Sequence, residues 1–336
     1  MSQSNSKQRI DYIDLFRAIG ILAMIMGHVK FGSAFSKWIH FFHMPMFFII
    51  SGYFYHGQSF SVMVKKRVKT LLVPYLVFGV LHCVISFIIN KQIDVHAFYL
   101  LFWENTAEGG VPIAGALWFL SAMMITEVLF CCLQQLNFSV WWKEIIAAMI
   151  VALAGMAFAT YLPFRLPWAI DAGMVGVGLY QIGKTIKEQW SELLEQKVVY
   201  SIVGIVLFSV LGLLCPSINL RTGKYGIWPM FWINAVGMTV SLLVFSKWFC
   251  QWAEKESLLA KPIAWFKGIG RESIVYLCLN QLAILAASAL LDLFLPSSSV
   301  ALLIVKKLLI LFVALGFLYP AQVLLKKTKL KAFLGR

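Results

Sequence analysis

The apolar residues of this chain occur in runs of about twenty, separated by short polar segments. A helix needs about that many apolar residues to cross the hydrocarbon core of a bilayer. The pattern therefore predicts an all-helical integral membrane protein, a polytopic bundle of about ten transmembrane helices. The predicted spans begin near Ile13, Trp38, Leu71, Ala114, Ile145, Trp168, Val198, Ile227, Ile269 and Val300.

The composition of the chain agrees with this pattern. Hydrophobic residues make up 60% of the 336 residues, and charged residues make up only 13%. Soluble domains carry about 25% charged residues, and no soluble fold could bury so many long apolar runs. No linker or low-complexity tract divides the chain, so we expect residues 1–336 to form a single transmembrane domain.

The net charge of +14 comes from Lys and Arg residues, most of which lie in the segments between the apolar runs. Cytoplasmic loops of membrane proteins carry an excess of these cations. Placing the N-terminus inside puts most of them on the cytoplasmic face, so both termini are predicted to be cytoplasmic. The charge therefore indicates contact with lipid in a multi-pass cell-membrane protein, and we expect no nucleic-acid partner.

The first predicted span carries an unusual group of ionisable residues, Asp14, Arg17 and His28. Arg17 and His28 are close to three helical turns apart, roughly 16 Å along one face. Asp14 lies one turn before Arg17 and could pair with it. Ionisable groups at membrane depth are costly and commonly mark function. The alternative is a neutral Asp14–Arg17 pair near one interface and an interfacial His28.

The histidines and cysteines do not show the spacing typical of a metal site. His40 and His43 lie one turn apart in the second predicted span, at about the depth of His28, and Pro45 is expected to loosen the helix there. Three His residues could suggest zinc, but no carboxylate or Cys joins them at ligand spacing. The six Cys residues lie in or beside apolar runs without paired spacing. We therefore expect no metal.

A basic cluster follows the second predicted span, in the sequence VKKRVK. Its cations could anchor the third span against anionic lipid, or they could bind the phosphates of a cytoplasmic cofactor. Composition does not choose between these roles. The cluster consists of Lys65, Lys66, Arg67 and Lys69.

Other polar residues inside the predicted spans are weaker candidates. Each is expected to face the bundle interior, where hydrogen bonding between helices is the simplest role. They are Glu127, Asp171, Asn234, Asn280 and Gln281.

Several of these segments together resemble one family of membrane enzymes. The runs DLFRAIGILAMIMGH and FHMPMFFIISGYF resemble two motifs of the acyltransferase 3 family, the second in its fucose 4-O-acetylase-like branch. The segments RVKTLLVPYL, GALWFL and GRESIVYLCLNQ are similar to its third-, fourth- and ninth-span patterns. The ninth-span pattern often ends in His, where this chain has Asn280, and an amide cannot act as a base near neutral pH.

The resemblance implies a membrane O-acyltransferase, an enzyme that transfers groups other than aminoacyl groups. Similar proteins move an acyl group, usually acetyl, from cytoplasmic acyl-CoA to a hydroxyl of an extracytoplasmic glycan. By this resemblance His28 is the catalytic His, Arg17 is the motif Arg, and Arg67 lies at the CoA end. Acetyl-CoA is the expected donor, although succinyl remains open. A cell-surface glycan or lipid-linked sugar is the expected acceptor, and the bacterial plasma membrane the expected location.

We hypothesise a reaction that uses both faces of the membrane. The CoA phosphates would rest on the basic cluster, and the pantetheine arm would pass Arg17, which Asp14 holds in place. His28 would act as the base toward a sugar hydroxyl, or would carry the acyl group in a transient intermediate. His43, Trp118 and Asp171 are candidates for contact with the acceptor. The developing oxyanion could be held by His43, Trp118 or a freed backbone N–H.

Two other functions remain open for a chain of this kind. One is a transporter or exporter of polysaccharide or small solutes, although no internal repeat supports it. The other is a membrane ligand-binding module that has lost catalysis.

Overall fold

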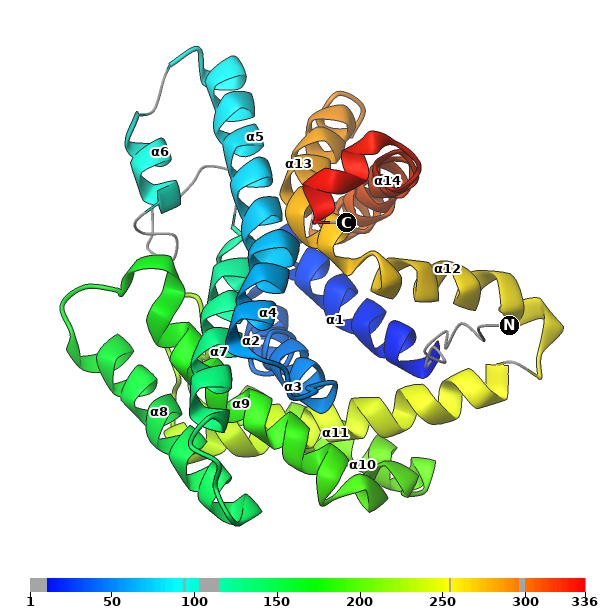
Figure 1. Cartoon of the computed structure of the whole chain (residues 1–336). Coiled ribbons are helices and arrows are strands. Elements are labelled where there is room, and N and C mark those ends of the chain that lie inside the picture. Colours follow the sequence, from blue (N-terminus) through cyan, green and yellow to red (C-terminus); the bar gives the residue numbers. More distant parts are fainter. Residues whose placement is uncertain (1–10, 93–94, 103–114, 254, 296–299, 336) are drawn as a thin grey trace, which may run out of the picture.

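The computed structural model describes residues 11–92, 95–102, 115–253, 255–295 and 300–335 (Figure 1). Helices make up 82% of the structure, and no strand occurs in these ranges, so the predicted all-helical class is confirmed. The predicted start of the fourth span at Ala114 lies outside the described residues.

Six helical segments of the described chain are long and apolar enough to cross a membrane. The predicted count of ten spans is therefore not confirmed. Two further apolar helices are shorter, α7 (Trp118–Gln134) and α10 (Val198–Leu214). The six segments are α1 (Asp11–Val29), the continuous run of α4 (Phe60–Arg67), a π-helical turn (Val68–Leu72) and α5 (Val73–Asn90), then α8 (Trp141–Tyr161), α11 (Trp228–Ala253), α13 (Ser273–Asp292) and α14 (Val300–Lys327).

The second predicted span is a broken helix rather than a continuous one. It consists of α2 (Ser33–His40) and α3 (Pro45–Tyr53). The connecting turn ends at Met44, and Pro45 occupies the start of α3, where its missing N–H costs no helical hydrogen bond. The expected loosening at Pro45 is thus a hydrogen-bonded turn over 41–44 between the two helices, and His43 lies in that turn.

The sixth predicted span, α9 (Ile170–Glu188), is polar and rich in glycine, and it is not among the six candidates. It lies inside the bundle, where it packs against α3, α7 and α8. A Cβ at Gly183 would collide with the backbone carbonyl of Ile49, so the absence of a side chain lets α3 and α9 approach closely. The polarity of α9 is therefore buried among other helices.

The remaining helices complete the second half of the chain. In Figure 1, α12 (Ala260–Arg271) runs beside α1, and α13 packs beside α14. A short helix, α6 (Val95–Phe102), lies against α5. Short 3₁₀ turns cover 167–169, 191–195, 257–259 and 329–334.

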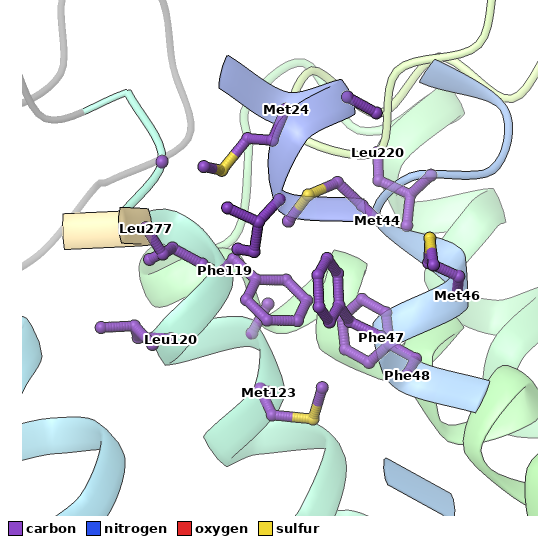
Figure 2. Packing of buried hydrophobic residues seen from close by; sticks show 14 of the residues in the cluster. Met24, Met44, Met46, Phe47, Phe48, Phe119, Leu120, Met123, Leu220 and Leu277 are labelled. Carbon is purple, nitrogen blue, oxygen red and sulfur yellow. The ribbon is translucent and has the colours of Figure 1, made fainter. Parts of the chain in front are cut away.

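The centre of the bundle is filled by aromatic and methionine side chains (Figure 2). Phe119 of α7 packs edge-on against Phe47 and Phe48 of α3, with ring centroids 5.8 and 5.1 Å apart. Met24 and Met123 belong to the same buried cluster. Methionine is unbranched and flexible, so this part of the core can repack more readily than one of branched residues.

Candidate active site

A cavity of about 200 Å³ lies where α1, the broken helix α2–α3 and the start of α7 meet. Three histidines, Trp118 and Arg221 contribute to its wall. The lining residues are Met24, Gly27, His28, Ile39, His40, His43, Met44, Gly115, Ala116, Trp118, Asn219, Leu220 and Arg221.

The helices explain why these side chains meet. His28 lies in the last turn of α1, and the break after α2 brings His40 and His43 beside it. The rings of His40 and His43 are perpendicular, with centroids 5.1 Å apart. Trp118 lies at the first position of α7 and is almost fully buried. The structure thus brings together three of the residues that the motifs suggested: His28, His43 and Trp118.

The hydrogen bonds of His40 and His43 define which ring nitrogen carries a proton. Nδ1 of His43 lies 2.7 Å from the carbonyl oxygen of Ile39, and Nδ1 of His40 lies 2.5 Å from that of Ser36. A carbonyl oxygen can only accept, so each Nδ1 donates. In the neutral rings the lone pair is therefore on Nε2, which leaves that nitrogen able to accept a proton.

His28 has a different partner, Gln281 of α13. The backbone N–H of Gly115 donates to Gln281 Oε1 at 2.7 Å, so the amide NH₂ group is the part of Gln281 that faces His28. Gln281 Nε2 lies 3.0 Å from His28 Nδ1 and donates to it. The proton of the neutral His28 ring is then on Nε2. If the amide were turned by half a rotation, Oε1 would accept from Nδ1–H and Nε2 of His28 would become the lone-pair nitrogen.

Arg221 reaches the cavity from a tight turn between α10 and α11. The side-chain oxygen of Asn219 accepts hydrogen bonds from the backbone N–H groups of Arg221 and Thr222, and a backbone bridge joins Asn219 to Lys224. Arg221 Nε is buried without a hydrogen-bond partner. Burial lowers the pKa of the Arg221 guanidinium below its ordinary value.

A buried ion pair lies next to the turn 219–224. Arg165 Nε lies 2.6 Å from Asp171 Oδ2, and the Asp171 side chain is almost fully buried. Gly223 has a left-handed backbone with φ of 71°, and a Cβ there would collide with the Arg165 guanidinium. Burial, with a contribution from the nearby Asp171 carboxylate, raises the pKa of the Tyr225 hydroxyl. Asp171 therefore lies behind the cavity wall, as the ion-pair partner of Arg165.

The opposite end of α1 is held by α12. Arg271 Nε donates to Asp14 Oδ2 at 3.0 Å, and Lys267 Nζ donates to Asp11 Oδ2 at 2.9 Å. The Arg17 guanidinium lies 5.8 Å from the ring centroid of Phe54, at the end of α3. The structure thus gives Asp14 a partner that helical spacing did not suggest, Arg271, because α12 packs along α1.

The basic cluster after α3 divides into two parts. Lys65, Lys66 and Lys69 are exposed, whereas Arg67 turns inward and forms an ion pair with Glu127 of α7. Glu127 is only 5% exposed, so the pair neutralises a buried carboxylate. Glu127 makes an interhelical contact, and Arg67 is its partner.

A larger hollow of about 690 Å³ lies at the ends of α3, α7 and α9 that are opposite the cavity of His28, His40 and His43. Tyr55, His56 and Gln134 line it together with Lys184 and Lys187. Lys184 is itself paired with Glu144 at 2.5 Å. With the orientation predicted from the loop charges, this hollow faces the cytoplasm and the histidine cavity faces outward.

The arrangement of possible metal ligands can be compared with the expectation from the sequence. Among the described residues, no three His, Cys, Asp or Glu side chains are grouped as metal ligands would be. His40 and His43 each use Nδ1 in a hydrogen bond to a backbone carbonyl, an interaction that requires no metal.

Two residues of the site had weak signals in the sequence. Gln281 was expected to bond between helices, and its contact with His28 confirms that expectation, although its partner was not foreseen. Arg221 was not identified, because a single cation in a short segment between apolar runs resembles any other loop residue. Only the folding of residues 219–224 toward the cavity distinguishes it.

The six long apolar helices of the described chain indicate a multi-pass membrane protein. The chain belongs to the acyltransferase 3 family, because the model of that family, described as an acyltransferase domain, matches residues 10–321. Comparison with curated proteins and with solved structures finds no match.

Proposed function

We propose that this protein is a membrane O-acetyltransferase that moves acetyl from cytoplasmic acetyl-CoA to a hydroxyl of a cell-surface glycan or lipid-linked sugar. Membership of an acyltransferase family supports the transfer of an acyl group. The observation that carries the site is the cavity in which His28, His43 and Trp118 meet at one end of α1. A bacterial plasma membrane, with the histidine cavity outward, is the proposed location.

The proposed chemistry is the attack of a sugar hydroxyl on the thioester. The hydroxyl oxygen forms a bond to the carbonyl carbon, the carbon–sulfur bond breaks, and CoA leaves as a thiolate. The hydroxyl proton passes to an imidazole and from there to the thiolate. In the alternative two-step route, the acetyl group first bonds to a ring nitrogen of His28 and is then passed to the hydroxyl.

The hydrogen bonds refine the role of His28. For His28 to act as the base at Nε2, Gln281 would turn its amide, accept from Nδ1–H and give up its bond to Gly115. A second assignment needs no such rotation. In that assignment, Nε2 of His43 takes the proton, and Nε2–H of His28 stabilises the developing oxyanion.

The donor is proposed to enter from the opposite face. Exposed Lys65, Lys66 and Lys69 lie on α4 and on the π-helical turn that follows it. Within the described chain no carboxylate pairs with these three cations, so they are suited to the CoA phosphates. Arg67 is less suited to this role because Glu127 already engages it. To reach the histidines, the pantetheine arm would displace side chains of the flexible methionine-containing core (Figure 2).

Transport is the second candidate function, and one observation favours it. Broken helices are typical of transporter binding sites, and α2–α3 is broken within the bundle, next to the cavity. The enzyme remains the stronger proposal because the chain belongs to an acyltransferase family. A non-catalytic ligand-binding module would bind acyl-CoA or glycan without turnover.

The test uses inverted membrane vesicles that contain the protein and its natural acceptor, supplied with acetyl-labelled acetyl-CoA. The proposal predicts labelled glycan, one CoA released for each acetyl transferred, and a mass increase of one acetyl group. Glycan movement without CoA release would identify a transporter. Binding of acetyl-CoA with neither product would identify a binding module.

A further inference from the structure

Arg221 is a half-buried cation, and none of the acidic side chains that the structure describes pairs with it. Its Nε has no hydrogen-bond partner, and within the described chain no carboxylate lies within ion-pair distance of its guanidinium. The nearby Arg165 is different, because Asp171 neutralises it at 2.6 Å. Arg165 contacts this turn at Gly223, and Arg221 is part of the turn and lines the cavity. Among the described residues, Arg165 has a carboxylate partner and Arg221 has none.

Leaving a charge in this position is costly. A cation that is partly removed from water, here through its buried Nε, loses hydration free energy that a paired carboxylate or a hydrogen bond would otherwise replace. Arg221 is nevertheless held in place, because the Asn219 side chain binds the backbone of Arg221 and so shapes the turn that presents it. An unpaired cation held by a defined turn is typical of a site whose anion comes with a ligand.

The surroundings of the cavity also favour an anion. The described residues that line it include no Asp or Glu. At the same end of the bundle, Asp171 is engaged by Arg165, and Asp292 is engaged by Lys306 at 2.5 Å. Asp171 and Asp292 are therefore already neutralised, and none of the described residues that line the cavity opposes the charge of Arg221.

The position of Arg221 indicates which substrate would bring the anion. The turn 219–224 connects α10 to α11 on the side of the histidines, opposite the hollow at the far ends of α3, α7 and α9. In the proposed function the acceptor enters from this side and acetyl-CoA enters from the other. The anion is therefore expected on the acceptor rather than on CoA.

We propose that Arg221 binds an anionic group of the acceptor, a carboxylate or a phosphate, so that the enzyme selects an acidic glycan. The planar guanidinium can hold either group through two parallel hydrogen bonds. This would place a neighbouring hydroxyl beside His28 and His43. The inference rests on the proposed function and adds the chemical class of its acceptor.

The experiment uses glycan extracted from cells that lack the gene, separated by anion exchange into a neutral and an acidic pool. Purified protein in liposomes receives labelled acetyl-CoA and either pool. We expect transfer to the acidic pool. Arg221→Gln should raise the KM for that pool about tenfold or more and leave the KM for acetyl-CoA unchanged. Lys224→Gln is the matched control, because Lys224 is an exposed cation in the same turn.

Chemical treatment of the acidic pool distinguishes the two anions. Carboxyl reduction abolishes the preference if the group is a carboxylate, and hydrogen fluoride treatment abolishes it if the group is a phosphate. Preferred transfer to the neutral pool would overturn the inference while leaving the proposed function intact. An equal fall in kcat for both pools, with unchanged KM, would also overturn it and make Arg221 an oxyanion donor. Transfer to neither pool would reject the proposed function itself.

Discussion

Gln281 and His28, which are 253 residues apart in the chain, are joined by a hydrogen bond of 3.0 Å between Nε2 of the amide and Nδ1 of the ring. The same amide is held from its other side by the backbone of Gly115. Gln281 therefore ties the end of α1 to the segment that leads into α7, and it determines which nitrogen of His28 carries a proton.

Replacing Gln281 should impair the reaction more than it impairs folding. Gln281→Leu removes the partner of Nδ1 and leaves the ring free to rotate. We expect kcat to fall by about 10- to 100-fold, in the range of a lost positioning contact, with little change in the KM for acetyl-CoA. Steady-state kinetics on purified protein would measure both values.

A second variant, Gln281→Glu, tests whether this side chain controls the protonation of His28. A carboxylate can accept from Nδ1–H and stabilise a protonated ring, so the acid limb of the pH–rate profile should shift to higher pH. Activity should return toward the wild-type value above that limb. If both variants show the wild-type rate and pH profile, Gln281 has no role in positioning His28.

His43 separates the two assignments of the base. If His43 is the base, His43→Gln should lower kcat by about 10²- to 10⁴-fold and remove the acid limb of the pH–rate profile. If His28 is the base, the same substitution should leave that limb in place and cost less. His40→Gln is the matched comparison, because its ring makes the same kind of backbone hydrogen bond.

The Arg67–Glu127 pair is expected to act on stability rather than on CoA affinity. Glu127→Gln leaves the Arg67 cation partly buried without its partner, which should cost about 3 kcal/mol in the free energy of unfolding. Lys65→Gln, at an exposed position of the same helix, should leave stability unchanged and weaken CoA binding. Thermal denaturation in detergent and titration with CoA would measure the two effects. A stable Glu127→Gln protein with weakened CoA binding would contradict this division.

The sequence was sufficient for the all-helical fold class and for the family. Apolar runs predict helices directly, whereas the number of spans was not confirmed, because α9 is polar and buried and the second run breaks at Pro45. Periodicity describes one helix at a time. It could place Arg17 and His28 on one face of α1, but not the contacts that depend on how helices pack, such as Asp14 with Arg271.

In the candidate site, too, residues with a local sequence signal could be predicted, whereas contacts between distant segments could not. His28, His43 and Trp118 could be chosen from motifs because each stands out in its own segment. Arg221 could not be chosen, because what distinguishes it is a place in the cavity wall and, among the described residues, the lack of a carboxylate partner, and no local sequence pattern records either. The partners of Asp171 and Arg67 were unforeseen for a related reason, since each ion pair joins different elements of the chain.

The central claim is that the His28 cavity is the centre of acetyl transfer, and His28 itself tests it most directly. Purified wild-type protein and His28→Ala would be compared in liposomes with labelled acetyl-CoA and acceptor glycan, after melting curves establish that both are folded. The account predicts a loss of transfer of at least about 10²-fold in His28→Ala, with acetyl-CoA still bound. A folded His28→Ala protein that transfers acetyl at the wild-type rate would contradict it.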